Sequence, residues 1–173
     1  MSVDFQSIDP YKIDESIFRL VGKDWMLITA GTTGSYNMMT ASWGGCGVLW
    51  NKPVAIIFVR PQRYTFDFIE KHDHFTLSFF GTKYKDILTM LGTNSGRDIE
   101  KMSTQGLRAT TTPKGNVFFE EARIVMECRK LYYDDIKPEF FLDKAIHKMY
   151  PSRDYHRIYI GEVIHALKRE HNH

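Results

Sequence analysis

The chain has 173 residues, of which 43% are hydrophobic, 14% aromatic and 25% charged, and its formal net charge at pH 7 is +2. This length and composition predict one folded domain over residues 1–173, and they exclude a disordered protein and a strongly basic nucleic-acid-binding domain. No apolar run reaches the roughly 18 residues of a membrane span, and the N-terminal segment lacks the basic and apolar regions of a secretory leader. We therefore expect a cytoplasmic protein without a membrane partner.

Strand patterns dominate the first part of the chain. Residues 25–30 and 38–43 are expected strands, and the glycines and small polar residues of segment 31–35 between them predict a hairpin turn longer than two residues. The following Gly44-Gly45-Cys46-Gly47 is interpreted as a turn, because glycine lets the backbone approach a flat or charged ligand. The apolar run 54–59 predicts a buried strand.

Polar and charged residues follow that buried strand. Arg60 and Arg63 flank a Pro-Gln pair, and Thr65 is expected to be the N-cap of a helix that ends near residue 72. Backbone N–H groups converge at a helix start, and arginine binds phosphate oxygens through paired hydrogen bonds, so this segment predicts a phosphate seat. The sequence contains no G-x-G-x-x-G and no G-x-x-x-x-G-K-[ST] motif, so neither a Rossmann unit nor a P-loop is supported.

The second half alternates strands with short helices. Strands are expected at 75–80, 117–119, 123–133 and 155–167, and helices at 83–91, 97–102 and 138–148. Alternation within 123–133 places Cys128 inward and Glu127 outward, on a half-solvated strand. At least six strands at hairpin-like spacing, with helices as inserts, favour a mainly β, closed antiparallel barrel over a doubly wound sheet.

Four segments resemble, in the same order, the FMN-binding split-barrel family, the flavin reductase-like proteins that include flavoredoxin. The first two are residues 37–43 (NMMTASW) and 60–65 (RPQRYT). The third is residues 95–98 (SGRD) with Lys101, and the fourth is residues 154–163, which carry a D-Y-H and a G-E-V element. The resemblance covers roughly residues 16–167. It implies a split β-barrel with Greek-key-like antiparallel strands.

The resemblance also implies a non-covalent site for FMN. In the family, the first segment lines the isoalloxazine ring and the ribityl chain, and the second holds the phosphate. No catalytic side chain is implied, because the flavin carries the chemistry. The implied cofactor-binding residues are Asn37, Met39, Thr40, Ala41, Ser42, Trp43, Arg60, Arg63, Tyr64, Thr65, Ser95, Gly96 and Lys101.

The cysteines and histidines carry weaker signals. Cys46 lies among glycines beside the expected flavin platform, which makes it a further candidate cofactor-binding residue; the alternative is a small filler of the core. Cys128 is expected in the core. His72 and His74 flank an aspartate at a helix end, which favours a capping and surface role, so no metal site is expected.

These features predict an FMN-binding oxidoreductase of the flavin reductase type, which passes electrons from NAD(P)H through FMN to free flavin, a partner protein or a small acceptor. The resemblance implies a homodimer with FMN at or near the subunit interface, and the 12 Phe, 9 Tyr and 3 Trp residues agree with a large buried interface. Two alternatives stay open: a flavoredoxin-type electron carrier without its own NAD(P)H activity, and a non-catalytic flavin-binding protein. The sequence does not distinguish NADH from NADPH.

Overall fold

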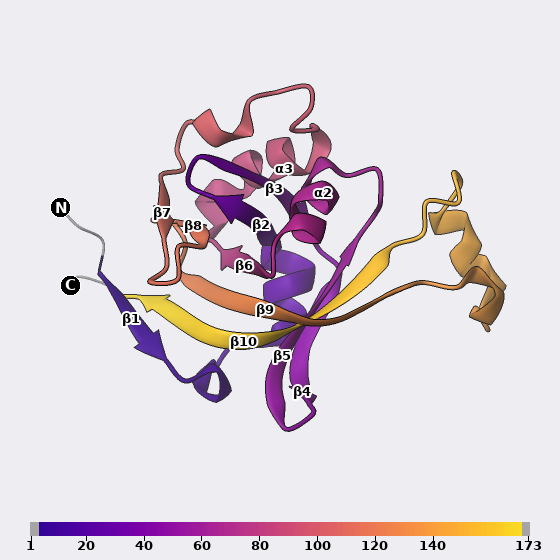
Figure 1. Cartoon of the computed structure of the whole chain (residues 1–173), viewed down its shortest axis with the longest axis horizontal. Coiled ribbons are helices and arrows are strands. Elements are labelled where there is room, and N and C mark those ends of the chain that lie inside the picture. Colours follow the sequence, from indigo (N-terminus) through magenta and orange to yellow (C-terminus); the bar gives the residue numbers. More distant parts are fainter. Residues whose placement is uncertain (1–3, 171–173) are drawn as a thin grey trace.

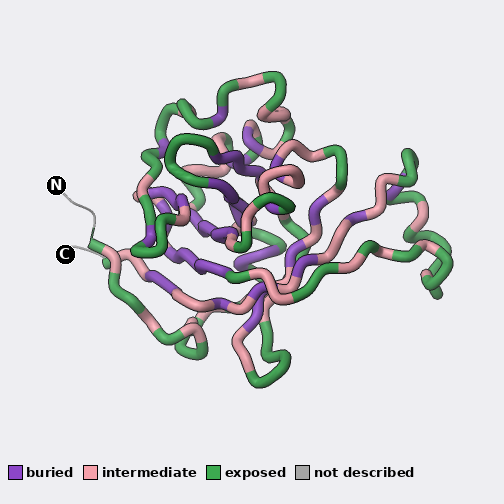
Figure 2. The backbone as a smooth tube through the Cα atoms, viewed as in Figure 1, coloured by how far each residue is buried: buried purple, intermediate pink, exposed green. Residues whose placement is uncertain are grey.

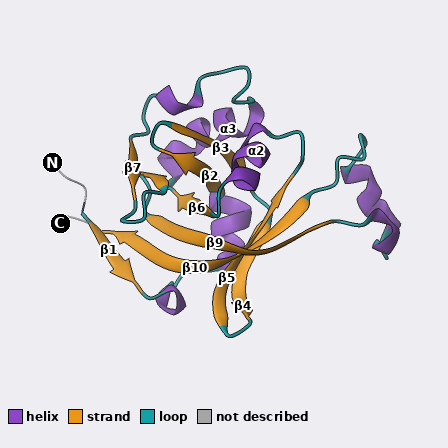
Figure 3. Cartoon of the chain, in the orientation of Figure 1, coloured by secondary structure: helices purple, strands orange, loops and turns teal. Residues whose placement is uncertain are grey.

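A computed structural model of the chain describes residues 4–170 (Figure 1). Strands dominate the described part of the chain, with helices inserted between them (Figure 3). The strands are β1 (Phe5–Ile8), β2 (Met26–Thr32), β3 (Ser35–Ala41), β4 (Gly44–Leu49), β5 (Lys52–Val59), β6 (His74–Phe79), β7 (Ala109–Thr111), β8 (Val117–Phe119), β9 (Ile124–Asp135) and β10 (Arg157–Arg169).

Eight of these strands form one antiparallel sheet. Its order is β3-β2-β6-β9-β10-β5-β4, and β1 pairs with β10 outside that path. β7 and β8 form a separate antiparallel pair. Among residues 4–170, β3 and β4 end the path and are not hydrogen-bonded to each other, so the path stays open. The mainly β, antiparallel architecture with short inserted helices is confirmed.

Two helices are longer than two turns, α2 (Tyr64–Lys71) and α3 (Lys85–Thr93). Helix α2 packs against β2 and β3, and α3 packs against β3. The other helical segments are short: α1 (Ile17–Arg19), a π-helical turn (Leu20–Asp24), and 3-10 turns at Pro10–Lys12, Thr82–Tyr84, Lys101–Ser103, Pro138–Phe140 and Lys144–Met149. Within residues 4–170, no helix combines the length and the apolar character needed to cross a membrane.

The core consists of two hydrophobic clusters, whose buried residues follow the strands in Figure 2. Successive residues of β2 divide between them, with Ile28 in one cluster and Leu27 in the other, because side chains alternate between the two faces of a sheet. Each fully buried side chain of this size contributes about 1.5–3 kcal/mol. One contact is especially close: a Cβ added to Gly161 of β10 would lie 2.8 Å from the Phe75 ring and 3.0 Å from the Cβ of Cys128.

The glycine-rich segment is a strand, which corrects its interpretation as a turn. Strand β4 pairs with β5, from Gly44 opposite Ile57 to Leu49 opposite Lys52. The turn comes later, at Trp50 and Asn51, whose φ angles are 51° and 55°. Two consecutive left-handed residues form the two-residue hairpin that matches strand twist, and asparagine tolerates this conformation. The prediction of a turn at residues 44–47 from their glycine content is therefore wrong, and the chain turns three residues later.

The two expected helices at 97–102 and 138–148 are also corrected. The first is a turn at Ser95–Ile99, where the Ser95 carbonyl accepts the N–H groups of Asp98 and Ile99, followed by the 3-10 turn at Lys101–Ser103. The second is divided into two 3-10 turns by residues 141–143. Neither segment is long enough to nucleate a stable α-helix without a packed apolar face.

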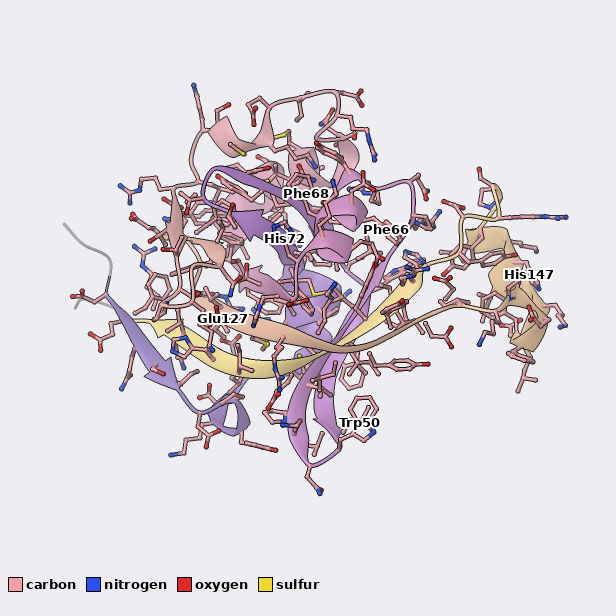
Figure 4. All side chains as sticks on the ribbon, viewed as in Figure 1. Trp50, Phe66, Phe68, His72, Glu127 and His147 are labelled. Carbon is pink, nitrogen blue, oxygen red and sulfur yellow. The ribbon has the colours of Figure 1, made fainter. Side chains whose placement is uncertain are left out.

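Glu127 is 1% exposed, although alternation placed it on a solvated face. The Thr112 hydroxyl and the Asn116 amide, on the chain segment that joins β7 to β8, both donate to Glu127 Oε1. Figure 4 shows Glu127 on β9 within the body of the molecule. Paired hydrogen bonds offset much of the cost of burying a carboxylate. The covering segment comes from another part of the chain, which local alternation does not reveal.

Residues 136–156, which we call the projecting segment, extend away from the sheet between β9 and β10 (Figure 1). His147, labelled in Figure 4, lies on it at a distance from the rest of the molecule. Its aromatic side chains pack on one another: the ring centroids of Tyr150 and Tyr155 are 4.7 Å apart, and Phe141 stacks on Tyr150 at 6.2 Å. This cluster gives the segment a small core of its own.

The β2–β3 hairpin offers a matched test of its glycines. Thr32 pairs with Ser35, so the turn has only two residues, which corrects the longer turn expected. Gly31 has a φ of +116°, and an added Cβ would lie 2.3 Å from the Ser35 carbonyl oxygen, whereas a Cβ on Gly34 meets nothing within 4 Å. We expect Gly31→Ala to lower the free energy of unfolding by about 1–3 kcal/mol and Gly34→Ala to change it by less than about 0.5 kcal/mol. Urea unfolding of both variants measures this, and equal losses would contradict it.

Candidate functional site

A cavity of about 190 Å³ lies where β3 and β5 end. A polar residue of the lining directly follows each strand, Ser42 after β3 and Arg60 after β5. Five consecutive residues after the middle of β3 form one wall. The full lining consists of Met39, Thr40, Ala41, Ser42, Trp43, Phe58, Arg60, Arg63 and His156.

Arg60 is held in place by the end of the projecting segment. Its Nη1 lies 2.6 Å from Asp154 Oδ2, and its Nη2 donates to the Met149 carbonyl at 3.0 Å. The guanidinium carbon lies 5.0 Å from the centroid of the Tyr150 ring. These contacts orient Arg60, and Asp154 neutralises its charge in the absence of another anion.

Arg63 has no such carboxylate. Its Nη2 donates to the Gly92 carbonyl at 2.9 Å, and within residues 4–170 it belongs to no ion pair. Burial lowers the pKa of its guanidinium, and the neighbouring charge of Arg60 adds to that effect. A half-buried cation beside another cation favours an anionic ligand.

Lys101 is a third cation in this region and is almost completely buried, at 3% exposure. Its ammonium donates to the carbonyls of Met38, at 3.0 Å, and Leu91, at 2.8 Å. Burial, followed by the charge of Arg63, lowers its pKa to about 8. Lys101 therefore contributes positive potential behind the cavity and does not line it.

Asn37, Thr65 and Gly96 meet in a layer next to the cavity. The Asn37 amide donates to the Thr65 hydroxyl at 2.8 Å. Thr65 is buried in the first turn of α2, and Arg63 is the N-cap residue, which corrects the expected capping role of Thr65. Gly96 is required here, because an added Cβ would lie 2.1 Å from the Asn37 side-chain oxygen and 2.9 Å from the Tyr64 ring.

Two further candidates serve local structure. The Thr40 hydroxyl donates to the Leu88 carbonyl at 2.5 Å, which joins β3 to α3. The Ser95 hydroxyl accepts the N–H of Arg97 at 3.1 Å, and the Arg97 guanidinium carbon lies 4.7 Å from the centroid of the Tyr64 ring. Tyr64 and Ser95 are absent from the lining of the cavity.

Cys46 does not line the cavity that contains Arg60 and Arg63. It is on β4, its sulfur is 3.8 Å from the sulfur of Met126, and it packs against the hydrophobic core. It lines two other cavities, and burial raises the pKa of its thiol to about 11, so it stays protonated at neutral pH. This environment resembles that of the core filler considered as its alternative.

His156 and Phe58 complete the cavity and were missing from the candidate residues. The Tyr150 hydroxyl is 2.8 Å from His156 Nδ1, and the His156 ring centroid is 5.2 Å from that of Trp43. Burial, and then the charge of Arg60, lowers the pKa of His156 to about 4, so the ring is neutral at pH 7. The D-Y-H element was a signal for His156. Phe58 looked like an ordinary strand residue.

Two arginines and a neutral histidine therefore line one cavity of this antiparallel β fold. A model of the flavin reductase-like domain matches residues 18–173. The chain belongs to the flavin reductase-like family. A search of curated protein sequences found no match.

Three solved structures are similar in fold. An FMN-binding domain of a flavin reductase-like enzyme from Shewanella baltica is 17% identical, with a TM-score of 0.69 over 97% of this chain and 78% of that chain. Flavoredoxin from Methanosarcina acetivorans is 20% identical, with a TM-score of 0.66 over 85% and 69% of the two chains. An NADH:FAD oxidoreductase from Streptomyces globisporus is 17% identical, with a TM-score of 0.61 over 85% and 78%. These similarities confirm the split-barrel fold.

The low pKa of His156 predicts how stability depends on pH. Its pKa is about 4 in the folded chain against 6.5 ordinarily, so between these values the unfolded chain binds more protons and acid destabilises the fold. We expect His156 to contribute a loss of up to roughly 3 kcal/mol as the pH falls from 6.5 to 4. Urea unfolding across this range should show a shallower pH dependence for His156→Gln than for the parent. Parallel profiles for the parent and His156→Gln would contradict the assignment.

Proposed function

We propose that this protein binds FMN in the cavity at the ends of β3 and β5 and transfers electrons from NAD(P)H through it. The observation that carries the proposal is Arg63, a half-buried cation without a carboxylate partner in the described residues, next to Arg60 and at the start of α2. A phosphate at this point would accept hydrogen bonds from both guanidinium groups and from the first backbone N–H groups of the helix.

The remaining candidates fit FMN in two groups. Arg60, Arg63 and the α2 start hold the phosphate, with Lys101 behind them, and Asn37, Tyr64, Thr65, Ser95 and Gly96 shape the layer that supports this end. Residues 39–43 present backbone groups and the Trp43 indole to the ring. The bound flavin supplies the hydride chemistry, and the protein supplies orientation and a positive environment that favours the reduced, anionic form.

The space available exceeds the first cavity. A neighbouring cavity shares part of its wall, at Thr40 and Ser42. An elongated ligand with a phosphate at Arg63 can therefore extend along the end of β3. Cys46 lines neither of these two cavities.

A homodimer is part of the proposal, and the projecting segment is the surface that supports it. Its side chains Phe140, Leu142 and Met149 are exposed, and Leu142 is 98% exposed. A stretch of apolar side chains that extends from the body without cover from its own chain favours a second copy as partner. Sedimentation at micromolar concentration with FMN bound measures this.

A flavoredoxin-type electron carrier is the second candidate function. Trp43, which lines the cavity, is 42% exposed. An indole over one ring face would block a nicotinamide and leave an exposed edge for electron transfer to a partner protein. A third possibility is a non-catalytic flavin-binding protein. Such a protein would bind the flavin, but NAD(P)H would not reduce it and it would not pass electrons to a partner protein.

The phosphate seat predicts a selective loss of affinity. FMN and riboflavin differ by the phosphate, so Arg63→Ala should weaken FMN by about 10- to 100-fold, equivalent to about 1.5–3 kcal/mol for a charged hydrogen bond, and leave riboflavin almost unchanged. Arg108→Ala is the matched control, because Arg108 is exposed and pairs with Glu120 and Glu121. Fluorescence titration of both flavins measures the affinities. Equal losses for FMN and riboflavin would show that Arg63 does not bind the phosphate.

Direct reduction by NAD(P)H separates the two candidate functions. If nicotinamide can stack on the ring, anaerobic mixing with excess NADH or NADPH should bleach the flavin absorption within seconds. A flavin that stays oxidised for many minutes with both donors, yet is reduced by dithionite, identifies the electron carrier. Trp43→Ala then provides the control, because removal of a covering indole should make reduction faster.

A further inference from the structure

A second cavity lies beside the proposed flavin site, between β4 and the helical segment 16–22. Its volume is about 570 Å³, within the range of about 300–1,000 Å³ typical of small-molecule sites. It shares Ser42 and Trp43 with the first cavity. The rest of its lining is Ser16, Ile17, Phe18, Val21, Gly22, Gly44, Gly45 and Cys46. We call it the β4 groove.

The lining of the β4 groove carries no charge. None of its described residues is acidic or basic, and the raised pKa of Cys46, about 11 because of burial, keeps that thiol neutral as well. A nicotinamide dinucleotide carries a pyrophosphate, which is usually bound by arginine or lysine, and the groove has neither. The groove therefore suits a neutral molecule, in contrast to the arginine-lined cavity next to it.

The groove also offers aromatic surface and backbone donors. Phe18 is 92% exposed and Trp43 is 42% exposed, so flat rings can reach both side chains. Strand β4 ends the path of the sheet and pairs only with β5 among the described residues, so every second residue turns its N–H and C=O groups outward. Gly45 has open space around its Cα, since an added Cβ would meet nothing within 4 Å. A ligand can thus approach this strand closely.

We propose that the β4 groove binds a neutral quinone that accepts electrons from the flavin. The inference deepens the proposed function and rests on it for the electron source. Trp43 and Ser42 form a common wall, which places a ring in the groove next to a flavin in the first cavity. The quinone takes up two electrons from the reduced flavin, one at a time across the shared wall, and two protons, one that the reduced flavin releases on oxidation and one from water. Hydroquinone and oxidised flavin result, so no acidic side chain is needed.

Binding can be measured without turnover. The probe is 2,3-dimethyl-1,4-naphthoquinone, which has no free ring position for addition of the Cys46 thiol. Equilibrium dialysis against the oxidised, FMN-loaded protein gives its affinity, and a ring-sulfonated analogue serves as the charged control. We expect the neutral quinone to bind at least 10-fold more tightly than the sulfonate. Equal affinities would overturn the uncharged character assigned to the site.

Two variants locate the ligand. Gly45→Leu fills the groove without a clash, so it should weaken the quinone at least 10-fold, and Phe18→Ala should weaken it through loss of exposed aromatic surface. Gly34→Leu is the matched control, because Gly34 also has open space but lies in the β2–β3 turn. FMN affinity should stay unchanged in all three. Unchanged quinone affinity in Gly45→Leu would overturn the proposal.

The second measurement follows electron transfer. Protein reduced with dithionite under anaerobic conditions is mixed with the quinone, and the rate of flavin reoxidation should saturate with quinone and fall at least 10-fold in Gly45→Leu. Quinone binding that is sensitive to Gly45→Leu, in protein whose flavin NAD(P)H does not reduce, would support the groove and contradict the reductase. A dimer that dissociates in Gly45→Leu together with the loss of quinone binding would overturn the proposal, because a second copy would then occupy the groove.

Discussion

Close packing at Gly161 fixes the strand on which the rest of the structure depends. β10 pairs with β1, β5 and β9, and its register against β9 shifts between Ile160 and Gly161. At that point the Phe75 ring and the Cβ of Cys128 occupy the space that any side chain would need. Because β5 leads to Arg60 and β10 begins just after His156, this packing sets the distance between the two sides of the cavity.

The cations around the cavity are held mainly by carbonyl oxygens. Lys101 donates to two carbonyls and Arg63 to one, while Arg60 has the carboxylate of Asp154. A carbonyl satisfies a donor without cancelling its charge, so the positive potential of this region persists in the folded protein. Burial of such charges costs free energy that an anionic ligand offsets.

The sequence predicted the parts of the fold that local patterns determine. β8 has the expected bounds, and the apolar or alternating runs correspond to β5, β6, β9 and β10 within a few residues. The sequence did not reveal β1, whose partner among the described residues is the distant strand β10, or the segment that covers Glu127. Of the candidate site residues, Arg60, Arg63 and five consecutive residues from Met39 meet in one cavity. His156 and Phe58 join them because strand pairing brings residues 58 and 158 opposite each other, which spacing alone cannot show.

The contact between Arg60 and Asp154 has a consequence for the order of folding. These residues are 94 positions apart in the chain, so their ion pair closes a long loop, which costs conformational entropy. The pair can therefore form only after β5 and β10 have come together. The contacts of Arg60 with the Met149 carbonyl and the Tyr150 ring should form at the same late stage of folding. We expect the sheet to form before its binding cavity, so a nascent chain acquires a recognisable barrel before it can retain a cofactor.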